Sequence, residues 1–423
     1  MEKPLTQHIK NDHTWLSLKE YEAVGGYQHL RKALKLNPQD ITKIIKDSGL
    51  KGRGGAGFST GTKWELVSLG DQSPKPKYFI ANADEMEPGS FKDRLLLEGN
   101  PHQLIEGIII GAYAIQAQFS FVFLRGAYHP AAKAITRAIE ESYQAGYLGE
   151  HIAGSDFKLE MSLHISQGRY MCGEETALLN ALEGKRANPR AKPPYPALSG
   201  LFGKPTIVNN VETLSNVPQI ISNGADWFMN LSKTGEGGTK LYGASGRVKN
   251  PGLWELPLGT SLREILEEHA GGMQEGYQLK GLLPGGGSTD FLTPEHLDVP
   301  MDYASIMKVG SRLGTGTIIV LDDKTCPVGM VGNLEKFFAQ ESCGWCTPCR
   351  EGLPWTAKIL DSLEAGNGKM EDLDILKFQT HYMAPGHTFC ALAPGAMEPL
   401  QSALQYFRED FERHIHEHKC PWK

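Results

Sequence analysis

The chain has 423 residues, 40% of them hydrophobic and 22% charged, which is ordinary for a globular protein with room for several domains. A formal net charge of −6 gives no electrostatic reason to expect a nucleic-acid partner. The longest apolar run, residues 108–115, contains Gly111 and is too short to cross a bilayer, so no direct membrane insertion is expected. Residues 1–10 lack the features of a secretion signal or transit peptide, which favours a bacterial cytoplasmic protein.

Helices and strands are predicted to alternate in the first half of the chain. Asp40–Ser48 has the pattern of a short helix, and a second helix is expected over Thr62–Leu69. Lys77–Ala81 and Phe119–Leu124 have the pattern of buried strands. This alternation predicts an α/β domain built on a largely parallel sheet.

The helix between these two strands has recognisable start signals. Asn100 can cap it, Pro101 suits its first position, and Gln103 can close a capping box. An apolar stripe at helical spacing follows, formed by Leu104, Ile105, Ile108, Ile109 and Ala112. Further on, residues 185–218 are rich in proline and glycine, which predicts a long ordered loop of the kind that binds ligands.

Two further modules are predicted after this loop. Residues 236–325 contain four candidate strands (240–244, 252–256, 278–283 and 317–321), and Ser261 opens a helix that ends at Gly271–Gly272, an order typical of a small β-grasp domain. From residue 326 four helices are expected, at 333–340, 355–363, 373–382 and 396–411, which predicts a four-helix bundle. The expected domains are therefore 1–235, 236–325 and 326–423.

Four cysteines have the spacing of an iron–sulfur site. Cys343, Cys346 and Cys349 are separated by two residues each, and Cys390 follows at a distance. Three thiolates at this spacing fit one corner of a [4Fe–4S] cluster, and the remote cysteine supplies the fourth ligand. Structural zinc more often uses two separated CxxC pairs, so zinc is the alternative rather than the first choice.

The other cysteines and the histidine-rich tail are not predicted to form a site. Cys172, Cys326 and Cys420 each stand alone in the sequence and are interpreted as buried or incidental thiols. His414 and His418 have helical spacing for a metal ion, but an exposed, frayed C-terminal helix is the expected structure.

A glycine-rich segment precedes the second helix. Gly52, Gly54 and Gly57 fit a G-x-G-x-x-G pattern, but the strand that should precede a dinucleotide-binding loop is not predicted there. Glycines still let backbone N–H groups approach an anion or a flat ring, and Arg53 and Lys63 are positioned in sequence to neutralise phosphate. The alternative is a flexible surface turn.

Polar and acidic residues follow the first predicted strand. They are Asn82, Asp84, Glu85 and Glu87, and ligands of open α/β sheets bind beyond the carboxyl ends of strands. A solvated acidic turn fits the same residues equally well.

Together these segments resemble the F (flavoprotein) subunit family of bacterial respiratory complex I. The motifs that carry the resemblance span most of the chain, at residues 52–61, 82–89, 168–176, 188–194, 203–213, 341–350 and 388–390. The resemblance implies a Rossmann-like FMN domain, a ubiquitin-like (SLBB-type) domain and a helical bundle with a [4Fe–4S] cluster. It also implies FMN as cofactor and NADH as substrate.

The resemblance further implies roles for individual residues. The glycine loop (Gly52, Arg53, Gly54, Gly55 and Gly57) would lie against FMN and NADH, together with Lys63, Asn82 and Asp84. Phe58 and Tyr195 match positions whose rings stack on adenine, with Tyr195 a departure from the family's usual phenylalanine. Further flavin-pocket positions are Tyr170, Gly173, Glu174, Glu175, Asn209, Asn210 and Thr213. The cluster ligands would be Cys343, Cys346, Cys349 and Cys390.

The expected reaction is hydride transfer from NADH to FMN, followed by single-electron transfer to the cluster and onward to quinone through partner subunits. Lys63 would hold phosphate, and a negative Glu87 or Glu175 near the nucleotide would help NAD⁺ leave. The expected partners are a thioredoxin-like [2Fe–2S] subunit and a large multi-cluster subunit, at the cytoplasmic face of the inner membrane. Two rival functions stay open: the diaphorase subunit of an NAD-linked hydrogenase or formate dehydrogenase, and a zinc-stabilised scaffold without flavin.

Overall fold

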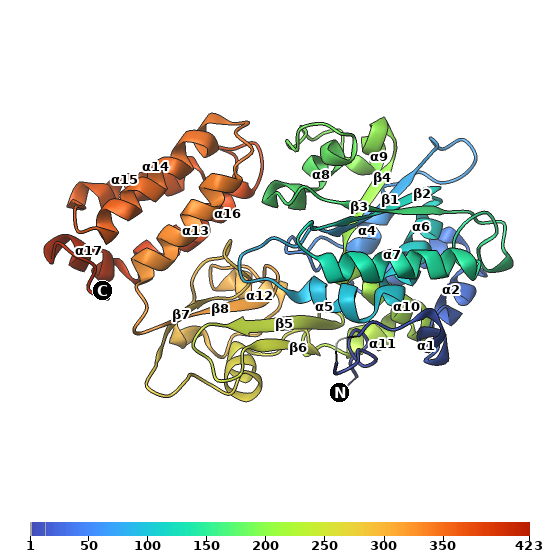
Figure 1. The fold of residues 1–423 in the computed structure, drawn as a ribbon, viewed down its shortest axis with the longest axis horizontal. Coiled ribbons are helices and arrows are strands. Elements are labelled where there is room, and N and C mark those ends of the chain that lie inside the picture. The colour runs from blue at the N-terminus through green and yellow to red at the C-terminus, as the bar shows by residue number, and fades with distance from the viewer. Residues whose placement is uncertain (1, 13) are drawn as a thin grey trace. The chain divides into compact units, whose positions relative to one another are not determined.

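The computed structural model describes residues 2–12 and 14–423, which fold as two compact units (Figure 1). The first unit contains residues 1–86, 91–241 and 255–259, and the second contains residues 87–90, 242–254 and 260–423. The chain therefore passes between the units several times. Among the described residues, no helix has both the length and the apolar composition needed to span a membrane.

Among the described residues, a parallel four-stranded sheet forms the centre of the first unit. The strands β1 (Tyr78–Ala83), β2 (Phe119–Leu124), β3 (Glu160–Ile165) and β4 (Thr206–Asn210) lie in the order β3-β2-β1-β4. All three neighbouring pairs are parallel: β1 with β2, β1 with β4, and β2 with β3. The predicted parallel sheet is confirmed, and its strands all end at the same edge.

Helices cover both faces of this sheet. On one face, Phe79 and Ala81 of β1 belong to a core formed with α6 (Pro101–Ile115), α7 (His129–Gln144) and α10 (Val211–Asn223). On the other face, Ile80 packs with apolar residues of α8 (Glu175–Leu182). Alternate residues of a strand point to opposite faces, so both faces of β1 are buried. The remaining helices of the unit are α1 (Leu18–Ala23), α2 (Gln28–Ala33), α3 (Pro38–Asp47), α4 (Thr60–Glu65), α5 (Lys92–Gly99), α9 (Pro196–Ser199) and α11 (Ala225–Asn230).

The second sheet also has four strands in the described part of the chain, in the order β6-β5-β8-β7. Their bounds are β5 (Thr239–Ser245), β6 (Gly252–Pro257), β7 (Leu279–Leu283) and β8 (Thr317–Asp322). β5 and β8 are parallel, whereas β7 and β8 are antiparallel. A π-helical turn, Glu264–His269, and the helix α12 (Tyr303–Lys308) connect the strands.

The C-terminal region is helical. Its elements are α13 (Pro327–Glu341), α14 (Thr347–Glu364), α15 (Met370–Tyr382), α16 (Leu392–Tyr406) and α17 (Arg408–His416), orange to red in Figure 1. α13 packs on α14 and α16, and α15 packs on α14 and α16. The prediction of one helix over 396–411 is wrong, because this stretch contains two helices, α16 and α17, which are separated at Phe407. The ring of Phe407 is buried, 5.3 Å from the ring of Phe291, so tertiary packing sets this break.

Three other predictions for the first unit require correction. Residues 185–218 are not one long loop, because they contain β4 and the start of α10, whose helical pattern is obscured by the internal Pro218. The helix expected to reach Leu69 ends at Glu65. Asn100 does cap α6, but Gln103 does not close a capping box. Its amide instead donates to the carbonyls of Pro4 and Ser215, at 2.9 and 2.8 Å, contacts that no local pattern reveals.

Candidate functional site

The glycine-rich segment forms a closed loop before α4. The backbone N–H of Gly52 donates to the carbonyl of Phe58 at 2.8 Å, and Lys51 pairs with Ser59. Gly55 and Gly57 have φ angles of +117° and +66°, a region in which other residues are strained. The loop conformation therefore depends on glycine at these two positions.

Arg53 has a different role from the predicted one. Its side chain is fully buried and donates to the carbonyls of Gly237 and Thr239, at 2.8 and 3.2 Å. A guanidinium held inside the fold in this way does not face a phosphate that arrives from solvent. The expectation that the Arg53 side chain neutralises phosphate is therefore not met, and Arg53 ties the loop to the chain before β5.

The loop lies against the end of β4. The N–H of Arg53 donates to Thr213 Oγ1 at 2.8 Å. A Cβ at Gly54 would lie only 3.1 Å from the Cβ of Asn210, so the backbone of the loop approaches the strand end closely. Asn210 in turn caps α10 and donates to Asp93 Oδ2 at 2.7 Å, while Asn209 accepts from the indole N–H of Trp64 at 2.8 Å.

The end of β1 contacts the segment that precedes α8. Asn82 Nδ2 donates to the carbonyl of Gly173 at 3.1 Å, and Asn82 Oδ1 accepts from the N–H of Asp84. Ser166, just after β3, donates to Asp84 Oδ2 at 3.0 Å. Polar groups from β1, β3 and β4 are thus gathered at the carboxyl edge of the sheet, where open α/β sheets bind ligands.

Two lysines and two glutamates lie at the start of α8. Lys63 Nζ is 2.6 Å from Glu175 Oε2, and Lys192 Nζ is 3.1 Å from Glu174 and 3.2 Å from Glu175. Burial alone would raise the pKa of Glu175, but Lys63 and then Lys192 outweigh it and hold that pKa below its ordinary value. Glu174 caps α8 by accepting from the N–H groups of Thr176 and Ala177. The Glu175 carboxylate is therefore ionised near neutral pH, with the two lysines beside it.

Two aromatic rings predicted to stack on adenine are exposed. Phe58 and Tyr195 each leave 54% of their surface accessible, although large aromatic side chains are usually well buried. Tyr170 and Gly173 form a short 3₁₀ turn before α8, and a Cβ at Gly173 would meet no atom within 4 Å. Open space beside a glycine turn, at the carboxyl edge of the sheet, fits a flat ring such as that of FMN.

Glu87 belongs to the second unit. Its Oε1 accepts from the N–H of Ser288 at 2.7 Å, and a Cβ at Gly286 would approach its Cγ to 2.6 Å. The backbone of residues 286–288 therefore holds this carboxylate. The other predicted flavin and nucleotide residues lie in the first unit.

The four predicted cluster cysteines are brought together at the starts of α14 and α16. Burial raises the pKa of Cys349 to about 12, with a smaller opposing contribution from Ser342, and the neighbouring Cys346, Cys390 and Cys343 add to the rise. The rings of Trp345 and Phe389 lie 6.1 Å apart, linking the two segments that carry the cysteines. Four thiols gathered in this way fit a site that a cationic iron core completes.

Lys192 is a site residue that the sequence analysis missed. It lies in the proline-rich segment that was predicted to bind ligands, but no pattern in the sequence pairs it with Glu174 and Glu175. Its position is set by the packing of that segment against α8, so only the tertiary structure identifies it.

Comparison with known proteins agrees with this geometry. Residues 45–219 match the Nuo51 FMN-binding domain, residues 244–291 match the SLBB domain, and residues 329–414 match the iron–sulfur binding region of NADH-ubiquinone oxidoreductase F. The NADH-quinone oxidoreductase F subunits of Salmonella typhimurium and Escherichia coli are each 57% identical over 97% of this chain and 93% of their own length.

The chain belongs to the NADH-quinone oxidoreductase F-subunit family. The predicted resemblance is thereby confirmed, and the chain carries the family's FMN-binding domain and iron–sulfur binding region. A solved structure of an NAD⁺-reducing [NiFe]-hydrogenase is also similar, with a TM-score of 0.82 and 34% identity over 97% of this chain and 68% of that one.

Proposed function

We propose that this F subunit oxidises NADH and passes the electrons through its own cofactors to partner subunits of a quinone-reducing complex. The observation that carries the proposal is the convergence, at one sheet edge, of the glycine loop, Asn82, Asn210 and the Lys63–Glu175 pair. When bound, FMN would supply the acceptor for a hydride from NADH, and a [4Fe–4S] cluster would supply the carrier for single electrons. The chain binds, orients and shields these groups.

Individual residues have distinct tasks in this scheme. Gly54, Gly55 and Gly173 leave room for the flavin and expose backbone N–H groups to it. Lys63 holds phosphate, and Glu175 fixes its position through an ion pair of 2.6 Å. Phe58 and Tyr195 stack on adenine, which their exposure permits. Gly52, Gly57, Asp84, Tyr170, Glu174, Asn209 and Thr213 complete the pocket.

The domain assignments form part of the proposal. Residues 1–235 are the FMN domain, and residues 236–325 are a β-grasp domain, supported by the sheet order β6-β5-β8-β7 with a parallel β5–β8 pair. Residues 326–423 are a four-helix bundle that holds the cluster through Cys343, Cys346, Cys349 and Cys390. The helix α17 is an addition to that bundle.

Partner subunits receive the electrons. We propose a thioredoxin-like [2Fe–2S] subunit and a large multi-cluster subunit, at the cytoplasmic face of the bacterial inner membrane, because the F subunits named above belong to multisubunit oxidoreductases. The similarity to an NAD⁺-reducing hydrogenase supports a second candidate, a diaphorase subunit. The higher identity and fuller coverage of the quinone-linked relatives favour the first.

Anaerobic NADH titration of the purified chain tests the proposal. Bleaching of a flavin absorbance band, accompanied by the low-temperature EPR signal of a reduced four-iron cluster, is expected. A colourless zinc protein that does not respond to NADH would instead establish the scaffold function. Quinone reduction by the assembled complex separates the two redox candidates, because a hydrogenase-linked subunit supports hydrogen-dependent NAD⁺ reduction.

A further inference from the structure

Four side chains with metal-binding donors converge in the C-terminal region, apart from the cluster cysteines in sequence. Cys326 is the N-cap of α13, Glu364 ends α14, His414 lies in α17, and Cys420 follows it. One donor atom from each lies within 4.8 Å of all the others. Residues from four separate segments are therefore directed at one point.

The separations between these donors are close to those around a tetrahedral metal ion. Cys326 Sγ lies 2.8 Å from Glu364 Oε1 and 3.3 Å from His414 Nε2, and His414 Nε2 lies 3.1 Å from Glu364 Oε1. Zinc ligated by sulfur at about 2.3 Å and by nitrogen or oxygen at about 2.0 Å places its donors roughly 3.3 to 3.8 Å apart. A small outward movement of the side chains would admit the ion.

Surrounding contacts orient each ligand. His414 Nδ1 lies 2.7 Å from the carbonyl of Asp410. A carbonyl can only accept, so Nδ1 carries the proton and Nε2 presents its lone pair to the other donors, as in metal-binding histidines. The N–H of Gly329 donates to Cys326 Sγ at 3.2 Å, and Lys423 Nζ lies 2.7 Å from the second oxygen of Glu364. Both contacts stabilise negative charge on a ligand.

The site lies largely inside the fold. His414 is fully buried and Cys420 is 3% exposed, while Cys326 and Glu364 are half-buried. The ring of Trp422 stacks on His414 with centroids 5.8 Å apart and an interplanar angle of 21°. Four protein donors with no open position are typical of a structural metal ion.

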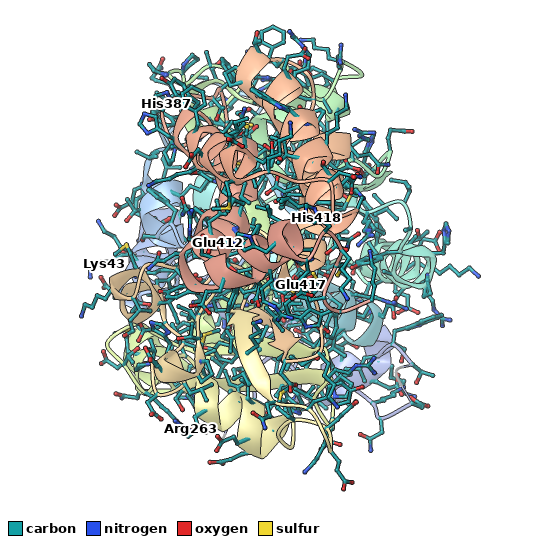
Figure 2. The ribbon with its side chains drawn as sticks, turned by 90° about the vertical axis from the view of Figure 1, so that its left-hand side faces the viewer. Lys43, Arg263, His387, Glu412, Glu417 and His418 are labelled. Atoms are coloured by element: carbon teal, nitrogen blue, oxygen red, sulfur yellow. The ribbon has the colours of Figure 1, made fainter. Side chains whose placement is uncertain are left out.

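We propose that Cys326, Glu364, His414 and Cys420 bind one divalent metal ion of the zinc class, which ties the C-terminal segment to α13 and α14. This changes two sequence-based interpretations. Cys326 and Cys420 are not isolated thiols, and α17 is not simply a frayed helix, because His414 lies in its buried face. Glu417 and His418 lie just beyond α17 (Figure 2). Both are exposed, and neither belongs to the group of four donors.

Metal analysis of the full-length chain, with iron measured in the same sample, tests the proposal. We expect about one zinc ion per chain in addition to cluster iron, with the zinc lost in Cys420→Ser and His414→Ala. His416→Ala is the matched control, since His416 is an exposed histidine of the same helix, and it should keep the zinc. Absence of zinc in the unmodified chain, or zinc unchanged in both ligand variants, would overturn the proposal.

X-ray absorption at the zinc edge gives a readout that does not depend on variants. Two sulfur neighbours at about 2.3 Å and two nitrogen or oxygen neighbours at about 2.0 Å are expected. Four sulfur neighbours would place the zinc at the cluster cysteines and refute the assignment. A Cys326–Cys420 disulfide, detected by mass spectrometry of the unreduced chain, would also refute it. The iron content and the NADH response report separately on the proposed function.

Discussion

Glu212 is the centre of an ion-pair network inside the first unit. Its Oε2 lies 2.7 Å from Lys240 Nζ and 2.9 Å from Lys92 Nζ, and Lys92 Nζ is 2.6 Å from Asp93 Oδ1. These side chains are at most 4% exposed. Burial would raise the pKa of Glu212, but Lys240 and Lys92 lower it to about 2, so the carboxylate is ionised throughout the physiological range.

Glu212→Gln should destabilise the chain by about 3–5 kcal/mol, because it leaves two buried ammonium groups without their shared counter-charge. Equilibrium unfolding in urea measures the change. The control is Glu65→Gln, which removes a carboxylate from an exposed ion pair with Lys46 in the same unit. Exposed pairs contribute roughly 0–1 kcal/mol, so equal effects of the two substitutions would contradict the prediction.

Glu398 should make stability depend on pH. Burial, opposed in part by Arg312 and reinforced by Asp290 and Glu87, raises the pKa of Glu398 from 4.5 to about 7. The folded chain then binds a proton that the unfolded chain has already released, so its stability falls as pH rises from about 4.5 to 7. The loss is roughly 3 kcal/mol across this window.

Urea unfolding of the wild-type chain and of Glu398→Gln across this window checks this prediction. The variant should lack the slope that Glu398 contributes, although its absolute stability also changes with the loss of the 2.8 Å ion pair to Arg312. Glu412→Gln, a substitution on α17 that removes a pair with Arg408, should keep the wild-type slope. A slope identical in all three chains would show that Glu398 titrates normally.

Glu87→Gln tests whether the charge of Glu87 distinguishes NADH from NAD⁺. The substitution keeps an oxygen that can accept from Ser288 but removes the negative charge. NADH carries one more negative charge than NAD⁺, so the ratio of NADH affinity to NAD⁺ affinity should rise about two- to tenfold, which corresponds to up to about 1.4 kcal/mol. That result would correct the expectation that Glu87 helps NAD⁺ leave, because the carboxylate would then disfavour NADH rather than NAD⁺. Binding titrations with both nucleotides measure the ratio. It should not change in Glu275→Gln, an exposed carboxylate of the same unit.

The contact between α6 and α10 shows how one residue controls the packing of two helices. Gly107 lies in α6, and a Cβ there would come within 2.1 Å of the carbonyl oxygen of Leu214 in α10. The helices approach each other through this glycine. An added methyl group must push the backbone of α10 away, because a carbonyl cannot move aside as a flexible side chain can.

Gly107→Ala should therefore destabilise the chain by about 1–3 kcal/mol despite alanine's higher helix propensity. Gly332→Ala in α13 is the matched comparison, because its Cβ would meet Leu360 at an ordinary 3.5 Å. That substitution should be neutral or stabilising by up to about 1 kcal/mol. Thermal or urea unfolding distinguishes the two, and a stabilised Gly107→Ala would show that α10 moves aside easily.

Elements with a strong local pattern were predicted well from the sequence. β2 has the predicted bounds, and α6 begins at Pro101 after its Asn100 cap. The prediction failed where a strand is short and a helix contains proline, as in β4 and α10. Those elements form because β4 is buried beside β1 and α10 packs on α6, and both contacts join residues far apart in the sequence.

The two cofactor regions fall into different units of the molecule, so their losses should be separable. Cys346→Ser should abolish the EPR signal of the reduced cluster, because oxygen is a poorer iron ligand than thiolate, while NADH still bleaches the flavin. Thr347→Ser, which keeps all four cysteines, is the control and should retain the signal. Loss of flavin reduction in Cys346→Ser would show that the cluster is needed for the FMN region to fold or bind.

The sequence by itself determined the features that depend on local spacing and residue chemistry. The cysteine spacing, the glycine loop and the helix signals each involve neighbours in the chain, and their combination was enough to predict the family, the parallel sheet and both cofactors. It did not determine which distant side chains meet. The burial of Arg53, the Lys192 contacts, the network around Glu212 and the convergence of Cys326 with His414 all depend on how elements pack. Packing energy belongs to the assembled core rather than to any segment, so only the tertiary structure decided these features.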